Sequence, residues 1–192
     1  MNRPLLLIDV DGVISLFGFD PARPPDGNFR NVDGIAHFLS AQAARHLLDL
    51  SQSFDPVWCT GWEEKANEYL PHALGLPGPW PYLQFAGPAI GGSGHWKLEA
   101  IDRYAGPLRP LAWIDDGHNE QTRAWAQARS APTLLICTEP PVGLTEEQCR
   151  ELLEWAQEVA VTENTGGSRE ATLDQDSPPS GEPNTSPEVA PK

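Results

Sequence analysis

Near its start the sequence has an unbroken run of four large aliphatic residues, Leu5–Ile8, which is followed by two aspartates. Four consecutive aliphatic residues without polar alternation are typical of a strand covered on both faces, as in the middle of a parallel sheet. Asp9 and Asp11 follow this predicted strand, and Gly12 lets the chain turn away there. Ligands of open α/β sheets bind beyond the carboxyl ends of the strands, which favours a functional role for both carboxylates.

Further apolar runs also end at polar residues, and they alternate with segments that have a helical pattern. Strands are predicted at residues 56–59, 111–114 and 133–137, and residues 82–85 are a candidate for one more. Helices are predicted at residues 40–50, 63–70, 97–104, 119–129 and 145–160. Strands that alternate with helices at this spacing predict an α/β fold, a Rossmann-like three-layer sandwich with a mostly parallel central sheet.

Local signals support some of these helix boundaries. Ser40 is suited to cap the first predicted helix, and Thr145 with Gln148 forms a capping-box pattern at the start of the last one. Pro71 limits how far the second helix can continue undistorted. Lys97 is expected in the first turn of its helix, where the helix dipole favours an anion.

Residues 14–38, directly after the first strand, have a different composition. Here Phe17, Phe19 and Phe29 are separated by three prolines and Gly27. Apolar residues on either side of a Pro/Gly turn region predict a hairpin or flap next to the first strand. An irregular surface loop anchored by a few aromatic side chains is the alternative.

Length and composition predict one domain with a tail. A chain of 192 residues that is 40% hydrophobic is long enough for one core, which we assign to residues 1–160. Residues 161–192 hold five prolines, no aromatic residue, and six acidic against two basic side chains, a net charge of −4. Such a segment buries too little apolar surface to offset the entropy of ordering, so we expect it to be disordered.

Charge and cysteine content exclude several classes of protein. A net charge of −14 disfavours binding to nucleic acid or to anionic lipid, since both need clustered Lys and Arg. The first apolar run is interrupted at Asp9, which fits neither a signal peptide nor a membrane span, so we expect a cytoplasmic protein. The three cysteines, Cys59, Cys137 and Cys149, lack the spacing of a metal or disulfide framework.

The candidate site residues are those that follow predicted strands or open a predicted helix. They are Asp9 and Asp11, Thr60 and Gly61, Lys97, and Asp115 and Asp116. Several carboxylates converging in one crevice repel each other and shift their pKa values unless a cation lies among them. The run at residues 91–94 is rich in glycine but lacks the G-x-x-x-x-G-K-[ST] pattern of a phosphate-binding loop.

In this order, the four groups resemble the motifs of the haloacid dehalogenase superfamily of phosphotransferases and phosphatases. The resemblance spans residues 5–116 and consists of D-x-D-G-V, a strand ending in Thr, a lone Lys, and a strand ending in Asp-Asp. It departs from the family at Val13, where many relatives have Thr. The insert after the first motif is short, which implies a flap in place of a large cap domain.

The resemblance implies a phosphomonoester hydrolase. Asp9 would attack phosphorus to form an aspartyl phosphate, and Asp11 would protonate the leaving oxygen and then deprotonate the hydrolytic water. Thr60 and the Gly61 N–H would bind the phosphoryl oxygens, while Lys97 would balance their charge. The presence of Asp11 argues against dehalogenation, which does not require an acid/base group. The expected partner is a phosphorylated small molecule.

The resemblance also implies a Mg²⁺ ion, which neutralises the repulsion between a carboxylate and a phosphate dianion. Its expected ligands are Asp9, the backbone carbonyl of Asp11, and one of Asp115 and Asp116. We favour Asp116 as the direct ligand, with the reverse order as the alternative.

Two other functions share these residue types. A protein of the same fold that binds a phosphorylated ligand with little turnover is the first, because motifs alone do not set a rate. A phosphorelay receiver domain is the second. Receivers place their lysine last, whereas here the acidic pair Asp115-Asp116 follows Lys97.

Overall fold

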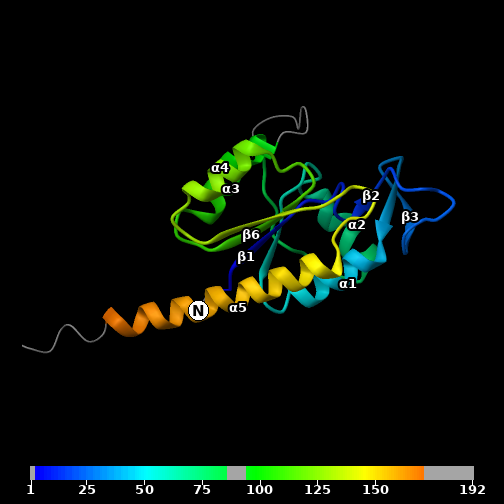
Figure 1. The fold of residues 1–192 in the computed structure, drawn as a ribbon. Helices are drawn as coiled ribbons and strands as arrows, with labels where there is room; N and C mark the ends of the chain where they lie inside the picture. The colour runs from blue at the N-terminus through cyan, green and yellow to red at the C-terminus, as the bar shows by residue number, and fades with distance from the viewer. Residues whose placement is uncertain (1–2, 86–93, 171–192) are drawn as a thin grey trace, which may run out of the picture.

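A computed structural model describes residues 3–85 and 94–170 of the chain. Its centre is a sheet of four parallel strands in the order β5-β1-β6-β7 (Figure 1). The strands are β1 (Leu5–Ile8), β5 (Asp55–Trp58), β6 (Leu111–Asp115) and β7 (Thr133–Cys137). All four residues of β1 are buried, as the unbroken aliphatic run predicts for a central strand.

Helices cover both faces of this sheet, which confirms the predicted α/β architecture of three layers (Figure 1). Leu6 and Ile8 of β1 pack on the face that carries α1, α2 and α5, while Leu5 and Leu7 pack on the face of α3 and α4. Successive side chains of a strand point to opposite faces, so one aliphatic run contributes to both cores. The helices are α1 (Ala41–Leu50), α2 (Lys65–Leu74), α3 (Leu98–Ala105), α4 (Glu120–Ala128) and α5 (Glu146–Glu170).

The predicted hairpin after β1 is present as a second, antiparallel sheet in the order β2-β4-β3. We call this sheet the flap; it consists of β2 (Ser15–Leu16), β3 (Gly27–Val32) and β4 (Ile35–Ser40). Its tight turn is Asp33-Gly34, both with positive φ, between the paired residues Val32 and Ile35. Asp-Gly suits such a two-residue turn. The proline-rich stretch instead links β2 to β3.

Both predicted helix caps form. The Ser40 hydroxyl accepts the Ala43 N–H at 3.1 Å, which fixes the start of α1. At the start of α5, the Gln148 N–H donates to Thr145 Oγ1, and the Thr145 N–H donates to Gln148 Oε1. These bonds satisfy backbone donors that the first turn of a helix leaves unpaired.

Two helices run past their predicted ends. Helix α2 continues through Pro71 to Leu74 and ends at Gly75, which has a φ of 66° and donates its N–H to the Pro71 carbonyl. Pro71 removes one backbone donor without ending the helix, because packing on the core holds the turn. Helix α5 crosses the predicted boundary at residue 160 and reaches Glu170. Residues 171–192 of the predicted tail lie outside the described residues.

The candidate strand at residues 82–85 does not form. Tyr82 makes a single parallel bridge to Trp58, and the Leu83 N–H donates to the Trp58 carbonyl at 2.9 Å. Pro79 and Pro81 lack the N–H groups that a longer ladder needs, so the pairing stops at one bridge.

Lys97 lies one residue before α3, at the end of the 3₁₀ helix η1 (Gly94–Lys97), and not in the first turn as predicted. The glycine-rich run at residues 91–93 falls outside the described residues. None of the helices in the described part of the chain combines the length and apolar character that crossing a bilayer requires.

Candidate active site

The site lies where the chain leaves the middle of the sheet. Strand β1 pairs with β5 on one side and β6 on the other, so the residues that follow these three strands meet at one edge of the sheet, where ligands of open α/β sheets bind. Ile8 is in register with Trp58 and with Ile114. Asp9 and Asp115 are therefore neighbours across the β1–β6 pair.

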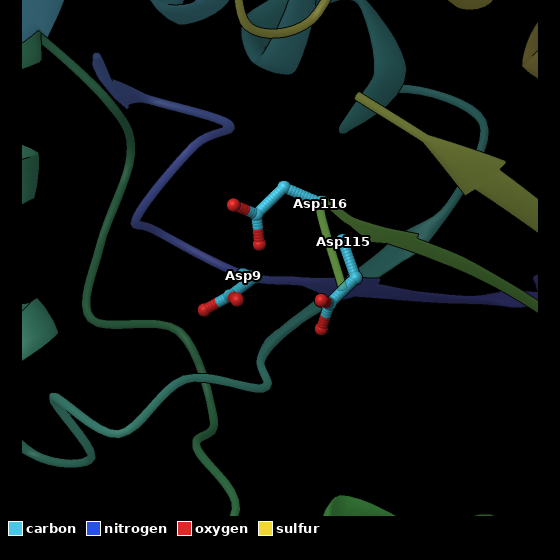
Figure 2. Close-up of side chains that lie close together, drawn as sticks. All are labelled: Asp9, Asp115 and Asp116. Atoms are coloured by element: carbon cyan, nitrogen blue, oxygen red, sulfur yellow. The ribbon is translucent and has the colours of Figure 1, made fainter. Parts of the chain in front are cut away.

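Three aspartates gather at this edge of the sheet. One carboxylate oxygen each of Asp9, Asp115 and Asp116 lies within 4.8 Å of the others, and Figure 2 shows the three side chains pointing toward a common space. Asp9 and Asp115 are buried, and Asp116 is partly exposed. The parallel register thus assembles two of the sequence-predicted groups that are more than 100 residues apart.

Gly12 makes room for this cluster. Its φ is +72°, and a Cβ at this position would lie 2.4 Å from Asp116 Oδ2. A glycine is needed on both counts, because other residues adopt this conformation at a cost and would clash with the Asp116 carboxylate. The buried Thr138 hydroxyl donates to the Gly12 carbonyl at 2.9 Å, which holds the turn in place.

Lys97 joins the two buried acids. Its Nζ lies 2.7 Å from Asp9 Oδ2 and 2.7 Å from Asp115 Oδ2, and its side chain is only 3% exposed. The remaining oxygen of Asp115 accepts the Gly117 N–H, and Oδ1 of Asp9 accepts the Val10 N–H, each at 2.8 Å. Both carboxylates are therefore held in one orientation, as catalysis by fixed groups requires.

The electrostatics of the site show a deficit of positive charge. Burial raises the pKa of Asp9 to about 7; the charge of Lys97 opposes this shift and that of Asp115 adds to it. Burial also raises the pKa of Asp116, again with a contribution from Asp115. Burial alone would lower the pKa of Lys97, but the charges of Asp9 and Asp115 outweigh it and raise that pKa.

This donor set fits a divalent cation. Three carboxylates face a single ammonium group, so a second cation would offset the excess of negative charge. Carboxylate oxygens are the hard ligands that Mg²⁺ prefers. Asp9, Asp115 and Asp116 can each offer one carboxylate oxygen to such an ion.

Within the described part of the chain, the Asp11 carboxylate is not one of the clustered acidic groups. Its side chain is 51% exposed and lies between the flap and the loop after β5. Oδ2 accepts the indole N–H of Trp62, in that loop, at 3.0 Å, and Oδ1 lies 3.7 Å from Nδ1 of His37 in the flap. Sequence reasoning placed Asp11 in the site but missed His37, whose position in the flap strand β4 carries no signal for this contact.

Thr60 and Gly61 follow β5, beside the end of β1. The Cys59 N–H donates to the Ile8 carbonyl at 2.8 Å, which places Cys59 level with Asp9 and Thr60 one residue further along the sheet edge. Thr60 is buried, and its hydroxyl accepts the Trp62 N–H at 3.3 Å. The rule that found Thr60 after its strand also applies to Thr138 after β7, which the sequence reasoning did not use.

Fold and site together define a three-layer α/β protein with a lysine-bridged cluster of aspartates at the carboxyl ends of its parallel strands. No family model matches the chain, and no curated protein matches it. Among solved structures, the chain is similar to 3-deoxy-D-manno-octulosonate 8-phosphate phosphatase from Moraxella catarrhalis, determined in complex with magnesium ion, phosphate ion and a KDO molecule. The identity is 19% over 85% of this chain and 92% of that chain, with a TM-score of 0.45.

Proposed function

We propose that the protein is a Mg²⁺-dependent phosphomonoester hydrolase that acts on a small phosphorylated molecule through an aspartyl phosphate. The observation that carries the proposal is the position of Lys97, which bridges Asp9 and Asp115 with Asp116 alongside. A buried lysine among acids is costly for a structural role, whereas phosphoryl transfer requires fixed positive charge next to a fixed nucleophile.

Asp9 is the proposed nucleophile. Its hydrogen bond from Val10 and its ion pair with Lys97 fix the carboxylate at the end of β1. Attack on phosphorus would replace one difficult displacement by two easier ones. As charge spreads over the phosphoryl oxygens, the Lys97 ammonium would stabilise it, and the Thr60 hydroxyl and the Gly61 N–H are the proposed hydrogen-bond donors on the other side.

The proposed metal ligands are Asp9, Asp116 and the backbone carbonyl of Asp11, with Asp115 orienting Lys97. When bound, Mg²⁺ neutralises the repulsion between the Asp9 carboxylate and a phosphate dianion. Asp11 is the proposed acid and base: half exposed at the entrance, its carboxyl group has access to a leaving group that must reach solvent.

The test is hydrolysis of p-nitrophenyl phosphate by the full-length protein with Mg²⁺. We expect activity that a chelator removes and that Asp9→Asn lowers by at least about 10³-fold, because removal of a covalent nucleophile affects the chemical step directly. Asp49→Asn, at an exposed acid of α1, is the matched control and should keep full activity. Equal activity in the wild type and Asp9→Asn would contradict the proposal.

The alternative of a phospho-ligand binding protein gives a different pattern in the same samples. It requires Mg²⁺-dependent binding of inorganic phosphate by the wild type without hydrolysis of any phosphomonoester. That result would retain the metal site and reject the enzyme.

A further inference from the structure

The surroundings of Asp11 are more organised than its exposure suggests. One carboxylate oxygen accepts the Trp62 indole N–H at 3.0 Å, and the other lies 3.7 Å from His37 Nδ1. The rings of Trp62 and His37 pack edge to face, with centroids 4.6 Å apart. Asp11 is therefore bounded on two sides by aromatic side chains that contact each other.

These two side chains are themselves held by different parts of the fold. His37 Nδ1 shares a hydrogen bond of 2.9 Å with the Ser15 hydroxyl across the flap strands β2 and β4. The Trp62 backbone N–H donates to Thr60 Oγ1, which ties the indole to the end of β5. Asp11 thus lies at a junction between the flap and the body of the protein.

We propose that Trp62 and His37 are positioning residues that orient the Asp11 carboxyl group for proton transfer to the leaving group. This inference rests on the proposed phosphatase function and deepens it. A half-exposed aspartate on a loop samples several rotamers, and each wrong rotamer removes the acid from the reacting oxygen. The hydrogen bond from Trp62 holds Oδ2 in one direction, which fixes the plane of the carboxyl group and the direction in which Oδ1 points.

The proton transfers of the two reaction steps define what the oriented Asp11 carboxyl group does. In the first step an Asp9 carboxylate oxygen forms a bond to phosphorus while the bond from phosphorus to the leaving oxygen breaks. The electron pair of the broken bond stays on the leaving oxygen, which takes the proton from the Asp11 carboxyl group. In the second step water attacks phosphorus, Asp11 takes a proton from the water, and the Asp9 carboxylate is released. Asp11 ends as it began.

This role predicts a dependence on the leaving group. p-Nitrophenolate is a stable anion and leaves with little protonation. Phenolate lacks the nitro group, is a less stable anion, and depends more on protonation of its oxygen. Loss of orientation should therefore affect phenyl phosphate strongly and p-nitrophenyl phosphate weakly. A purely structural role would lower both rates together.

The first experiment compares kcat/KM for both substrates in Trp62→Phe and in Trp125→Phe, with Mg²⁺ and the full chain. This parameter reports the steps up to loss of the leaving group and leaves out hydrolysis of the aspartyl phosphate, in which Asp11 acts as the base for both substrates. Trp125 also donates its indole N–H to an aspartate, Asp102 at 3.1 Å, but on the outer helices α3 and α4. General acid catalysis contributes about 10²–10⁴-fold, so we expect Trp62→Phe to lose about tenfold or more on phenyl phosphate and under about threefold on p-nitrophenyl phosphate. Trp125→Phe should leave the ratio of the two rates unchanged.

The second experiment uses His37. Asn at this position places an amide group near the site of Nδ1 and can still bond the Ser15 hydroxyl, whereas Ala cannot. We expect His37→Ala to lower the phenyl phosphate rate selectively and His37→Asn to recover part of it. His46→Ala, on α1, is the control and should match the wild type.

The outcomes separate this inference from the proposed function. If Asp9→Asn is inactive but Trp62→Phe and His37→Ala lower both rates equally, the positioning role is wrong and the phosphatase stands. The same holds if the wild type hydrolyses p-nitrophenyl phosphate but not phenyl phosphate, since Asp11 then supplies no proton. If Asp9→Asn remains active, the proposed function fails and the inference fails with it.

Discussion

Two lysines of this protein pair with aspartates in opposite settings. Lys97 is 3% exposed and bridges Asp9 and Asp115 at the centre of the sheet edge. Lys65, at the start of α2, is 55% exposed and pairs with Asp33 in the turn of the flap, where the Tyr69 hydroxyl also donates to Asp33 at 2.8 Å. The Lys97 network lies in the candidate site, and the Lys65 network joins the turn of the flap to helix α2.

The difference between these networks shows what burial does to the same ion-pair chemistry. Hydrogen bonds from Lys65 and Tyr69 stabilise the charged carboxylate of Asp33 and lower its pKa. Because Asp33 is exposed, burial opposes this shift only weakly. Burial raises the pKa of Asp9 despite its contact with Lys97. Exposed pairs add little stability, while buried ones carry a desolvation cost that a functional site can justify.

Removing the buried cation should have the largest effect. Lys97→Met leaves Asp9 and Asp115 facing each other without their shared partner, and breaking a buried pair costs about 3–5 kcal/mol. We expect a drop of this size in the free energy of unfolding, measured by urea denaturation without Mg²⁺, and loss of hydrolysis. Lys65→Met is the control from the exposed network. Equal changes in the two variants would contradict the contrast.

The raised pKa of Asp9 gives the second prediction. Between its ordinary value of 3.8 and about 7, the folded protein holds a proton that the unfolded chain releases. Without Mg²⁺, stability therefore falls as pH rises through this window, by at most about 1.4 kcal/mol per pH unit. Asp9→Asn lacks this group, so its stability relative to the wild type should increase from pH 4 to pH 7. A difference that stays constant over this range would show that Asp9 titrates normally.

Gly12→Ala should have an intermediate effect and separates strain from crowding. Its positive φ costs an alanine about 1–2 kcal/mol, and the new Cβ would also collide with Asp116. Gly34→Ala is the matched control, with a φ of +86° and no atom within 4 Å of its Cβ. We expect both variants to lose stability in urea, but only Gly12→Ala to lose Mg²⁺ affinity by calorimetry. Unchanged Mg²⁺ binding in Gly12→Ala would place the metal elsewhere.

Asp33→Asn should have the smallest effect. It weakens an exposed pair, so the midpoint of urea unfolding should barely move. Local opening is the sensitive measurement: hydrogen exchange of the β3–β4 hairpin amides should become faster while that of β1 stays the same. A large shift in the global midpoint would show that the flap tip is part of the main cooperative unit.

Most of the site could be predicted because strand ends are local signals. Asp9 and Asp115 each follow an unbroken apolar run, and a parallel sheet brings such ends to one edge. Lys97 was predicted only as a lone basic residue in the first turn of a helix. The burial of Lys97 between two acids depends on where the 3₁₀ helix η1 packs against the sheet, and no short-range sequence pattern predicts that position.

Other features depend on contacts between distant segments. The orientation of Asp11 toward Trp62 and His37 requires the flap to pack against the loop after β5. The turn at Asp33-Gly34 carried a local signal, since Asp-Gly between alternating residues favours a hairpin, but the prolines upstream suggested a different turn position. Helix α5 includes residues 161–170, the first part of the segment 161–192. The average composition of that whole segment gave no sign that its first residues are helical.

Locating the bound metal ion is the decisive experiment for the proposed site. Crystals of the full-length protein soaked in Mn²⁺, which also binds carboxylate sites and scatters anomalously, would locate the cation. We predict one strong anomalous peak beside the carboxylates of Asp9 and Asp116, close to Lys97, and its loss in Asp116→Asn. A peak elsewhere with this cluster empty, or an undiminished peak in Asp116→Asn, would contradict the proposed site.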